Sequence, residues 1–401
     1  MVLYKQFNKQ AKGDEAYAGL AEVMGVMKNK QKQARKEWPT MKKYQASPYL
    51  RTVSAPELGV AMVYHALYGN PRIVNEEGLW FLDIFKEPVT MAEAAERCDR
   101  DPSDVAEEFR EIFFLVEPSV NEKEFLFQKR AQGLARVANK ETVDRMGLAI
   151  SDSCNLGCGH CIHFQSESNN GASLPMYQKP ANQLNMSWET AKQCVDRYVK
   201  LMREGGKTLC KIHFGNAEPL INWSVIEKVL HYSESIEGME FEFAINTNLV
   251  LMNREIAETF KKYRVRIATS LDGTAHANDA IRTTKNGRGT FESIIAKFDL
   301  LVEIGYPLDG FSITVTSGNF NLVDTDIIDL AAGRGMTSIA FDYDLVSLID
   351  IPVKTRVEKL MRIKRYADER GIAFFGTWDS PFRNITSESL LTGDHAFCAA
   401  V

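Results

Sequence analysis

The sequence predicts an α/β protein in which six strand–helix units form a parallel sheet with helices outside it. The first observation is a regular alternation of short apolar strands and amphipathic helices between residues 146 and 345. The second is a tight group of three cysteines directly after the first of these strands. The third is a different pattern before residue 146, where short strands and three helices indicate a smaller domain.

Composition narrows the class of protein. A chain of 401 residues with 45% hydrophobic and 25% charged residues fits a globular enzyme of two or three domains. Its net charge of −5 argues against nucleic acid as a partner. We expect no signal peptide and no membrane span, and the seven cysteines do not resemble a secreted disulfide framework. The sequence therefore predicts a cytoplasmic protein without a membrane partner.

Residues 1–48 are predicted to form a basic helical arm. Up to Lys43 the arm carries ten lysines or arginines and four acidic residues, and apolar residues have helical spacing from Glu15 to Met27. A charge run of this kind is typical of a solvated helix. A docking surface for an acidic peptide is the alternative interpretation.

Residues 49–145 are predicted to form a winged-helix-like domain. The two expected strands are residues 60–65 and 71–75. The three expected helices are residues 76–86, a second one from Thr90 and a third from Ser103, and residues 116–127 would form a small wing. Glu93 follows Thr90 at the spacing of a capping box. Winged helices often bind DNA, but phosphates would be repelled by the acidic face of the third helix, which carries Asp104, Glu107, Glu108 and Glu111.

The larger domain spans residues 146–345. Its six predicted strands are residues 147–151, 209–214, 240–246, 265–271, 310–316 and 338–343. Helices are predicted between them at residues 187–204, 223–237, 253–263, 290–304 and 323–332. This order makes the strands parallel and gathers the loops that follow them at one end of the sheet, where we expect the functional side chains.

The cysteines stand in the order Cys-x3-Cys-x2-Cys, at Cys154, Cys158 and Cys161. Three thiolates at the end of one strand can converge on a single soft metal centre, but they do not complete the four-ligand shell of a structural zinc or an ordinary iron–sulfur cluster. An open position on a redox cluster is a place for a ligand. A zinc site or a disulfide is the alternative.

This spacing is the signature of the radical SAM enzymes, and the chain resembles that family. The resemblance implies a partial (β/α)6 barrel and a [4Fe-4S] cluster held by the three cysteines, with S-adenosyl-L-methionine (SAM) on the fourth iron. Reductive cleavage of SAM would give a 5′-deoxyadenosyl radical that abstracts a substrate hydrogen. His160 replaces the aromatic residue that the family usually has near the adenine.

The stretch Phe214-Gly-Asn-Ala-Glu-Pro219 resembles the family's Gly-Gly-Glu-Pro motif. There, backbone polar groups and the glutamate bind the amino group of SAM. The resemblance thus implies cofactor-binding roles for Gly215, Asn216, Ala217 and Glu218. Asn216 and Ala217 depart from the usual pair of glycines.

Two later strand ends also follow the family's pattern. The stretch Ala244-Ile-Asn-Thr-Asn248 resembles its Thr-Asn pair, so Asn246 and Thr247 would line the cofactor pocket, with an asparagine-rich turn as the alternative. Ser270 would hydrogen-bond the ribose or the carboxylate of SAM, and Arg282 would pair with the carboxylate, which suits a forked cation. Asp272 is assigned to the same cofactor site, with a structural role as the alternative. No residue is assigned as a catalytic acid or base.

Residues 346–401 are predicted to be a C-terminal extension. Its final stretch, with Cys398, resembles the first cysteine of a SPASM domain, the module that holds auxiliary clusters in peptide-modifying relatives. Such a domain needs several more cysteines. We therefore expect either that the chain is truncated or that auxiliary clusters are absent.

The resemblance as a whole implies a SPASM-type radical SAM maturase, an oxidoreductase-like enzyme that installs a crosslink or another modification in a ribosomally made peptide (a RiPP). Residues 49–145 resemble the leader-recognition domain of such enzymes, so the expected partners are the leader and core of a precursor peptide. A reductant such as flavodoxin or ferredoxin would supply the electron. The alternatives are a sulfatase-maturing, formylglycine-generating enzyme and a non-catalytic peptide-binding protein.

Overall fold

The computed structural model describes residues 41–56, 59–99, 101–139, 141, 143–161 and 185–378. These residues form two compact units, the first ending at Asn139 and the second running from Lys140 to Trp378. Most of the predicted basic arm and the SPASM-like stretch around Cys398 lie outside the described residues. Among the described helices, none has both the length and the apolar character that a bilayer span requires.

The first unit contains two small antiparallel sheets. One has the strand order β2-β3-β4, and the other the order β5-β1-β6. The strands are β1 (Lys43–Ala46), β2 (Leu50–Ala55), β3 (Val60–His65), β4 (Gly69–Asn75), β5 (Val89–Thr90) and β6 (Leu115–Val116). Its helices are α3 (Glu76–Ile84), α4 (Met91–Cys98), α5 (Ser103–Glu111) and α6 (Glu122–Ala138).

The core of this unit is aromatic. Phe81, Phe85, Phe109 and Phe114 are each almost completely buried. The rings of Phe81 and Phe109 meet edge to face with centroids 5.6 Å apart, and Phe109 also contacts Phe114 at 5.7 Å. Edge-to-face contacts of this kind add to the stabilisation that burial of the rings provides. They hold helices α3 and α5 together.

Comparison with the expected elements gives both agreement and one error. Strands at 60–65 and 71–75 and three helices are present, and Thr90 and Glu93 form the predicted capping box. The predicted wing at residues 116–127 is wrong. Helix α6 starts at Glu122, after Asn121, whose side-chain oxygen accepts the backbone N–H of Glu124 as an N-cap does. A winged-helix fold is therefore not established.

The second unit is built on parallel strands in two groups, β7-β8-β9-β10 and β11-β12-β13. An isolated parallel bridge from Ser270 to Ser312 joins the groups between β10 and β11. The strands are β7 (Met146–Ala149), β8 (Leu209–Gly215), β9 (Glu240–Asn246), β10 (Arg266–Ala268), β11 (Gly310–Val315), β12 (Ser338–Tyr343) and β13 (Ala373–Phe375). The six predicted parallel strands are confirmed, and β13 continues the sheet beyond them.

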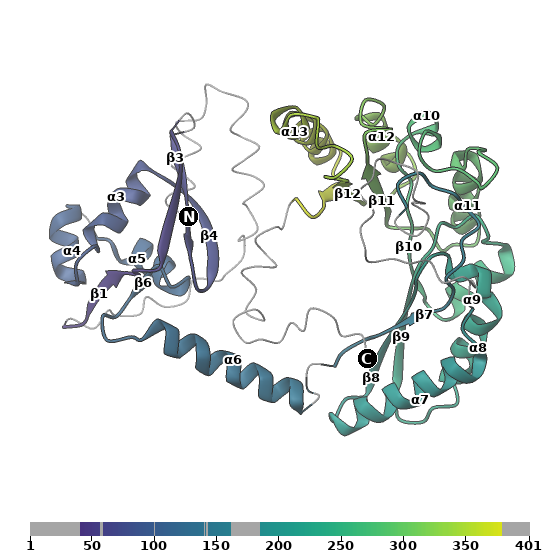
Figure 1. Ribbon diagram of the computed structural model, residues 1–401, viewed down its shortest axis with the longest axis horizontal. Helices are drawn as coiled ribbons and strands as arrows, with labels where there is room; N and C mark the ends of the chain where they lie inside the picture. The colour runs from purple at the N-terminus through teal and green to yellow at the C-terminus, as the bar shows by residue number, and fades with distance from the viewer. Residues whose placement is uncertain are drawn as a thin grey trace. The chain divides into compact units, whose positions relative to one another are not determined.

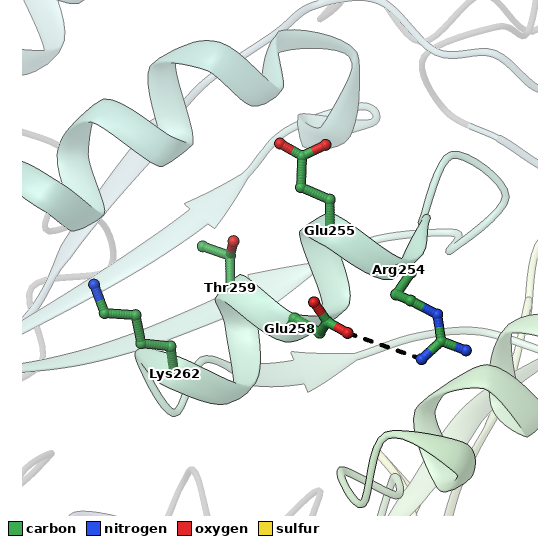
Figure 2. Close-up of a pocket in the computed structure, with 5 residues that line it drawn as sticks. All are labelled: Arg254, Glu255, Glu258, Thr259 and Lys262. Carbon is green, nitrogen blue, oxygen red and sulfur yellow. Dashed lines mark ion pairs between the residues drawn. The ribbon is translucent and has the colours of Figure 1, made fainter.

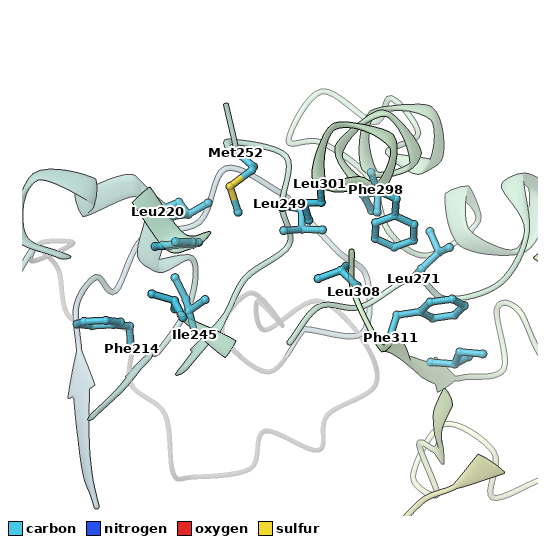
Figure 3. Close-up of a cluster of buried hydrophobic side chains, with 14 of the residues drawn as sticks. Phe214, Leu220, Ile245, Leu249, Met252, Leu271, Phe298, Leu301, Leu308 and Phe311 are labelled. Carbon is cyan, nitrogen blue, oxygen red and sulfur yellow. The ribbon is translucent and has the colours of Figure 1, made fainter. Parts of the chain in front are cut away.

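Helices cover the outer side of these strands, as Figure 1 shows for the green part of the ribbon. They are α7 (Trp188–Glu204), α8 (Trp223–Ser233), α9 (Arg254–Lys262), α10 (Ala275–Asp279), α11 (Phe291–Glu303), α12 (Asp326–Ala332) and α13 (Val353–Glu369), with the 3-10 turn η2 (Pro219–Asn222) before α8. Apolar side chains such as Phe214, Ile245, Leu249, Phe298 and Phe311 fill the space between helices and strands (Figure 3). This core fixes the strand ends from which the candidate site is built.

Candidate active site

The cysteine loop follows β7 and is held by backbone hydrogen bonds at both ends. The N–H of Ile150 donates to the carbonyl of Gly215 at 3.2 Å, before the cysteines. Further on, the N–H of Gly157 donates to Thr283 at 2.8 Å and that of Gly159 to Ile281 at 2.9 Å. The loop therefore lies between the end of β8 and the segment that follows α10, two parts of the chain that are far apart in sequence.

The three thiols share one environment. Burial raises the pKa of Cys154, and it raises the pKa of Cys158 to about 11. Negative charge on Cys161 raises the pKa of both. In the part of the chain that the structure describes, no three metal-binding side chains stand close enough to hold a single ion. The loop thus offers three neighbouring sulfur ligands and no finished mononuclear site.

Polar hydrogens of the protein point at two of these sulfurs. The backbone N–H of Leu156 lies 3.4 Å from Cys154 Sγ, and Asn248 Nδ2 lies 3.6 Å from the same atom. Arg282 Nη1 lies 3.9 Å from Cys158 Sγ. Donors and positive charge stabilise thiolates, the form in which cysteine binds metal. This donor set fits an iron–sulfur cluster held by the three thiolates.

The turn after β8 has the backbone geometry that glycines favour. Asn216 has φ 70° and Ala217 has φ 36°, both in the left-handed region. Asn216 Nδ2 donates to the carbonyl of Ser151 at 3.2 Å and to Asp152 Oδ1 at 2.5 Å. The asparagine therefore ties this turn to the start of the cysteine loop, a contact that a glycine could not make.

Glu218 is completely buried, and both of its carboxylate oxygens accept hydrogen bonds within the protein. Oε1 accepts from Thr247 Oγ1 at 2.7 Å and from the N–H of Leu220 at 3.0 Å, and Oε2 accepts from the N–H of Asn248 at 2.7 Å. Burial raises the pKa of the carboxyl group, although the three donors oppose that effect. Its own N–H donates to Ser153 at 3.0 Å. Glu218 thus fastens the end of β9 to the cysteine loop.

Asn248 is the site residue that the sequence did not single out. It is 8% exposed, and its side chain contacts both Cys154 Sγ and Asn155 Oδ1, the latter at 2.9 Å. It directly follows Thr247 in the Asn-Thr-Asn stretch that ends β9. The signal that could have found it is this second asparagine, since a strand end that brings Thr247 to Glu218 also brings the next residue to the cysteine loop.

Asp272 and Arg282 form a buried ion pair. Arg282 Nε lies 2.8 Å from Asp272 Oδ2, and Asp272 Oδ1 accepts the N–H of Thr314 at 2.9 Å. Burial alone would lower the pKa of Arg282, but the charges of Asp272 and Cys158 outweigh it and raise the pKa. The guanidinium therefore spans the space between β11, through Asp272, and the cysteine loop.

His160 lies beside this pair, with Nε2 3.8 Å from Asp272 Oδ2. Burial lowers the pKa of its imidazole. Its Nδ1 is buried, and in the described part of the chain it has no hydrogen-bond partner. The hydroxyl of Thr269 is in the same condition. A buried polar atom without a partner is unusual in proteins and indicates a place where a ligand can complete the hydrogen bonds.

The remaining predicted residues end neighbouring strands. Gly215 closes β8, and Asn246 closes β9 with an exposed side chain. Ser270 forms the bridge to Ser312 and is half-buried. Thr247 is buried, and its hydroxyl is directed to Glu218. The structure brings all the predicted residues to one end of the sheet, with Glu218 and Thr247 facing each other.

A shallow depression elsewhere on this unit does not belong to the site. It lies along helix α9 and is lined by the side chains in Figure 2, namely Arg254, Glu255, Glu258, Thr259 and Lys262. Arg254 and Glu258 form an ion pair 3.8 Å long one helical turn apart. Exposed pairs at this spacing are common on the outer faces of helices. We assign it no function.

The family model of the radical SAM superfamily matches residues 148–331. These residues include the three cysteines, the turn at Asn216 and the Asp272–Arg282 pair. Over these residues the chain is similar to the radical SAM superfamily. Members of this superfamily use a [4Fe-4S] cluster and SAM, and the three thiols, the polar hydrogens directed at them and the unpartnered nitrogen of His160 fit these cofactors.

Several relatives extend the comparison. The radical SAM cyclopropyl synthase TigE of Paramaledivibacter caminithermalis is 24% identical over 361 residues, which cover 88% of this chain and 75% of that protein. The mycofactocin maturase MftC of Mycolicibacterium smegmatis is 26% identical over 190 residues, which cover 47% of this chain and 41% of that protein. Among solved structures, Streptococcus suis SuiB bound to the precursor peptide SuiA is 14% identical with a TM-score of 0.42, covering 83% and 72% of the two chains.

Proposed function

We propose that this protein is a radical SAM enzyme that modifies a ribosomally made peptide. One observation carries the proposal: the similarity to the cyclopropyl synthase covers 88% of the chain, whereas the superfamily match is confined to residues 148–331. The similarity therefore includes much of the first unit as well as the domain that binds the cofactors. A first unit shared with the cyclopropyl synthase favours a shared use of that unit, and the edge of β2 that is free among the described strands suits it to an extended peptide.

The chain's own residues prepare the cofactor site in three ways. Cys154, Cys158 and Cys161 would hold the cluster, which, when loaded, supplies the electron that cleaves SAM to a 5′-deoxyadenosyl radical for hydrogen abstraction. Arg282 places positive charge beside Cys158, and its position is fixed by Asp272. Both carboxylate oxygens of Glu218 already accept hydrogen bonds inside the protein, so Glu218 holds the strand-end loops in place. Oε2 accepts only one of these bonds and would keep a site for the amino group of SAM.

His160 and the strand-end residues would complete the SAM pocket. The unpartnered Nδ1 of His160 offers one hydrogen bond to a bound ligand. Asn246, which is exposed, and Ser270, which is half-buried, end adjacent strands and can offer polar groups to the same ligand. Gly215, Asn216 and Ala217 present the backbone of a turn at this edge. An electron donor such as flavodoxin or ferredoxin would be the reductant.

The first unit would recognise the peptide. Strand β2 pairs only with β3 in the order β2-β3-β4, so one of its edges is free among the described strands. Val53, Met62 and Ile73 stand opposite one another across the three strands, and Val53 and Ile73 are 53% and 39% exposed. An extended peptide can add to such an edge through backbone hydrogen bonds and place apolar side chains beside this row.

The cofactor part of the proposal is tested with anaerobically reconstituted protein. We expect about four irons per chain, the broad visible absorption of a [4Fe-4S] centre, and formation of 5′-deoxyadenosine from SAM after reduction. Cys154→Ala, Cys158→Ala and Cys161→Ala should each abolish all three. Stoichiometric zinc without iron in the anaerobic protein would refute the cofactor assignment.

The peptide part is tested with proline substitutions in β2. In an antiparallel pair, alternate residues point their N–H groups toward the partner strand or away from it. One of Thr52→Pro and Val53→Pro therefore removes an outward N–H and leaves the bonds to β3 in place. We expect that variant to keep its melting temperature and SAM cleavage but to lose affinity for a precursor peptide, measured by fluorescence anisotropy. Any short reading frame found beside this gene would supply the peptide. Unchanged affinity in both variants would rule out addition at this edge.

A further inference from the structure

We propose that Asn248 is a positioning residue that tunes the iron–sulfur cluster through a hydrogen bond from its side-chain amide to the sulfur of Cys154. Asn248 Nδ2 lies 3.6 Å from Cys154 Sγ, within the range of an N–H···S hydrogen bond. Asn248 stands 94 residues from this cysteine in sequence. The contact is therefore made by the fold of the domain and not by the cysteine motif itself.

The orientation of the amide follows from its other partners. Its Oδ1 accepts the backbone N–H of Val250 at 3.0 Å, and a backbone N–H can only donate. The NH2 group must therefore be on the other side, where it faces Cys154 Sγ and Asn155 Oδ1. Asn155 Oδ1 is itself an acceptor at 2.9 Å, so the two amide hydrogens have two acceptors. The sulfur receives a donor in this arrangement.

The backbone of Asn248 is fixed as firmly as its side chain. Its N–H donates to the buried carboxylate of Glu218 at 2.7 Å, and the whole residue is only 8% exposed. This connects Glu218, whose oxygens all accept donors inside the protein, to a cysteine that it does not touch. Glu218 would then act on the cluster by holding Asn248 in place.

The consequence for the cluster follows from charge. Hydrogen bonds donated to the sulfurs of an iron–sulfur cluster stabilise its more negative, reduced form and so raise its reduction potential. Cys154 already accepts the N–H of Leu156 at 3.4 Å, and Asn248 adds a side-chain donor. Because Cys154 is partly buried, water is less able to replace a donor that is removed.

The inference depends on the cluster of the proposed function but not on the identity of the substrate. Two variants remove the donor: Asn248→Leu, which has a similar shape, and Asn248→Asp, which keeps an oxygen for Val250. The matched control is Asn253→Ala. Asn253 caps helix α9 by accepting the N–H of Ile256 at 2.8 Å, so this variant loses an asparagine hydrogen bond at a position that contacts no sulfur in the described structure.

The measurements are iron content, melting temperature and the midpoint potential of the reconstituted cluster from a titration followed by electron paramagnetic resonance. We expect a more negative potential in Asn248→Leu and a still more negative one in Asn248→Asp, where a carboxylate faces the sulfur. Asn253→Ala should melt earlier than the wild type but keep the wild-type potential.

Three outcomes would overturn the proposal. The first is a wild-type potential in a variant of Asn248 that retains its iron. The second is an equal shift in Asn253→Ala, which would show that the change reports general loosening. The third is folded variants of Asn248 that bind no iron, since the residue would then serve assembly of the cluster and not its potential. Failure of the wild type itself to bind a cluster would instead refute the proposed function.

Discussion

Each unit of the molecule contains a buried glutamate whose partners come from distant parts of the chain. In the first unit, Glu122 accepts Ser47 Oγ at 2.9 Å and lies 2.7 Å from His65 Nε2. In the second unit, Glu218 accepts three donors, of which Thr247 Oγ1 is one. Both are 4% exposed or less. The two carboxylates are alike in burial and hydrogen bonding. They differ in the side chains that surround them.

The group Ser47, His65 and Glu122 has the residue types of a hydrolase triad, but its hydrogen bonds run differently. Ser47 Oγ lies 2.9 Å from His65 Nε2 and from both carboxylate oxygens of Glu122. A nucleophilic serine needs an unprotonated histidine nitrogen as its base. His65 Nδ1 accepts the backbone N–H groups of Leu67 and Tyr68 at 3.1 and 3.2 Å. Both ring nitrogens of His65, the hydroxyl of Ser47 and the carboxylate of Glu122 are therefore all engaged in hydrogen bonds inside the core. The group therefore joins the β1–β2 turn, the end of β3 and the start of α6.

Glu218 also connects distant parts of its unit, but it does so next to the cysteine loop. The residue that it fixes, Asn248, faces Cys154, and the nearby His160 has a buried nitrogen without a partner in the described structure. The comparison teaches that a buried, hydrogen-bonded carboxylate does not by itself mark a catalytic site. Groups that are left incomplete by the fold, such as three thiols and an orphaned nitrogen, distinguish the second unit.

The largest expected effect comes from removal of each carboxylate. Glu122→Ala and Glu218→Ala should each cost about 3 kcal/mol of stability, because buried donors lose their acceptor. Chemical denaturation measures both losses in the free energy of unfolding, provided that the dependence on denaturant concentration has the same slope in the variant and the wild type. Only Glu218→Ala should also change the midpoint potential and SAM cleavage. If Glu122→Ala impairs SAM cleavage at a temperature where it is folded, the separation of roles between the two carboxylates is wrong.

A smaller effect is expected when one hydroxyl is removed from each group. Tyr68 donates to the carbonyl of Glu122 at 2.6 Å, and Thr247 donates to Glu218 Oε1 at 2.7 Å. Tyr68→Phe and Thr247→Val should each cost about 1–2 kcal/mol, since a buried hydrogen bond is lost while the shape is kept. We expect a shift in potential only in Thr247→Val, where the carboxylate that holds Asn248 is loosened. Equal potentials in both variants would argue against transmission through Glu218.

The sequence supported the second unit much better than the first. Parallel strands of the second unit are apolar runs that recur with helices between them, and the cysteine spacing is specific. In the first unit, β1 has the sequence Lys-Tyr-Gln-Ala and β2 is exposed on most of its length, so neither shows a clear apolar face. The joining of Ser47 to Glu122, 75 residues apart, has no local signal at all.

Within the site, residue identity was easier to predict than residue role. The cysteines, Glu218, Asp272 and Arg282 all lie at the strand ends where the motifs placed them. The sequence did not show that Glu218 would accept hydrogen bonds from Thr247 and two backbone N–H groups. Hydrogen bonds between strand ends depend on the conformation of the neighbouring loops. For the same reason the sequence does not predict the contact of Asn248 with Cys154.

The smallest expected effect concerns backbone strain at two left-handed residues, one in each unit. Ala217 in the site turn has φ 36°, and Asp99, which ends helix α4, has φ 51°. A left-handed conformation costs an alanine about 1–2 kcal/mol relative to glycine, and it costs less for aspartate, which adopts it more readily. Glycine loses part of this gain through its greater freedom in the unfolded chain. Ala217→Gly should therefore stabilise the protein by up to about 1 kcal/mol, and Asp99→Gly by less.

The functional consequence separates the two glycine variants. Asp99→Gly lies in the first unit and should leave SAM affinity unchanged. Ala217→Gly makes the turn between Asn216 and Glu218 more mobile, so we expect a gain in melting temperature together with weaker SAM binding, measured by equilibrium dialysis on the reconstituted protein. This result would mean that strain at Ala217 keeps the turn in the shape that binds SAM. A stabilised Ala217→Gly variant with unchanged affinity would show instead that the strained alanine contributes nothing to the site.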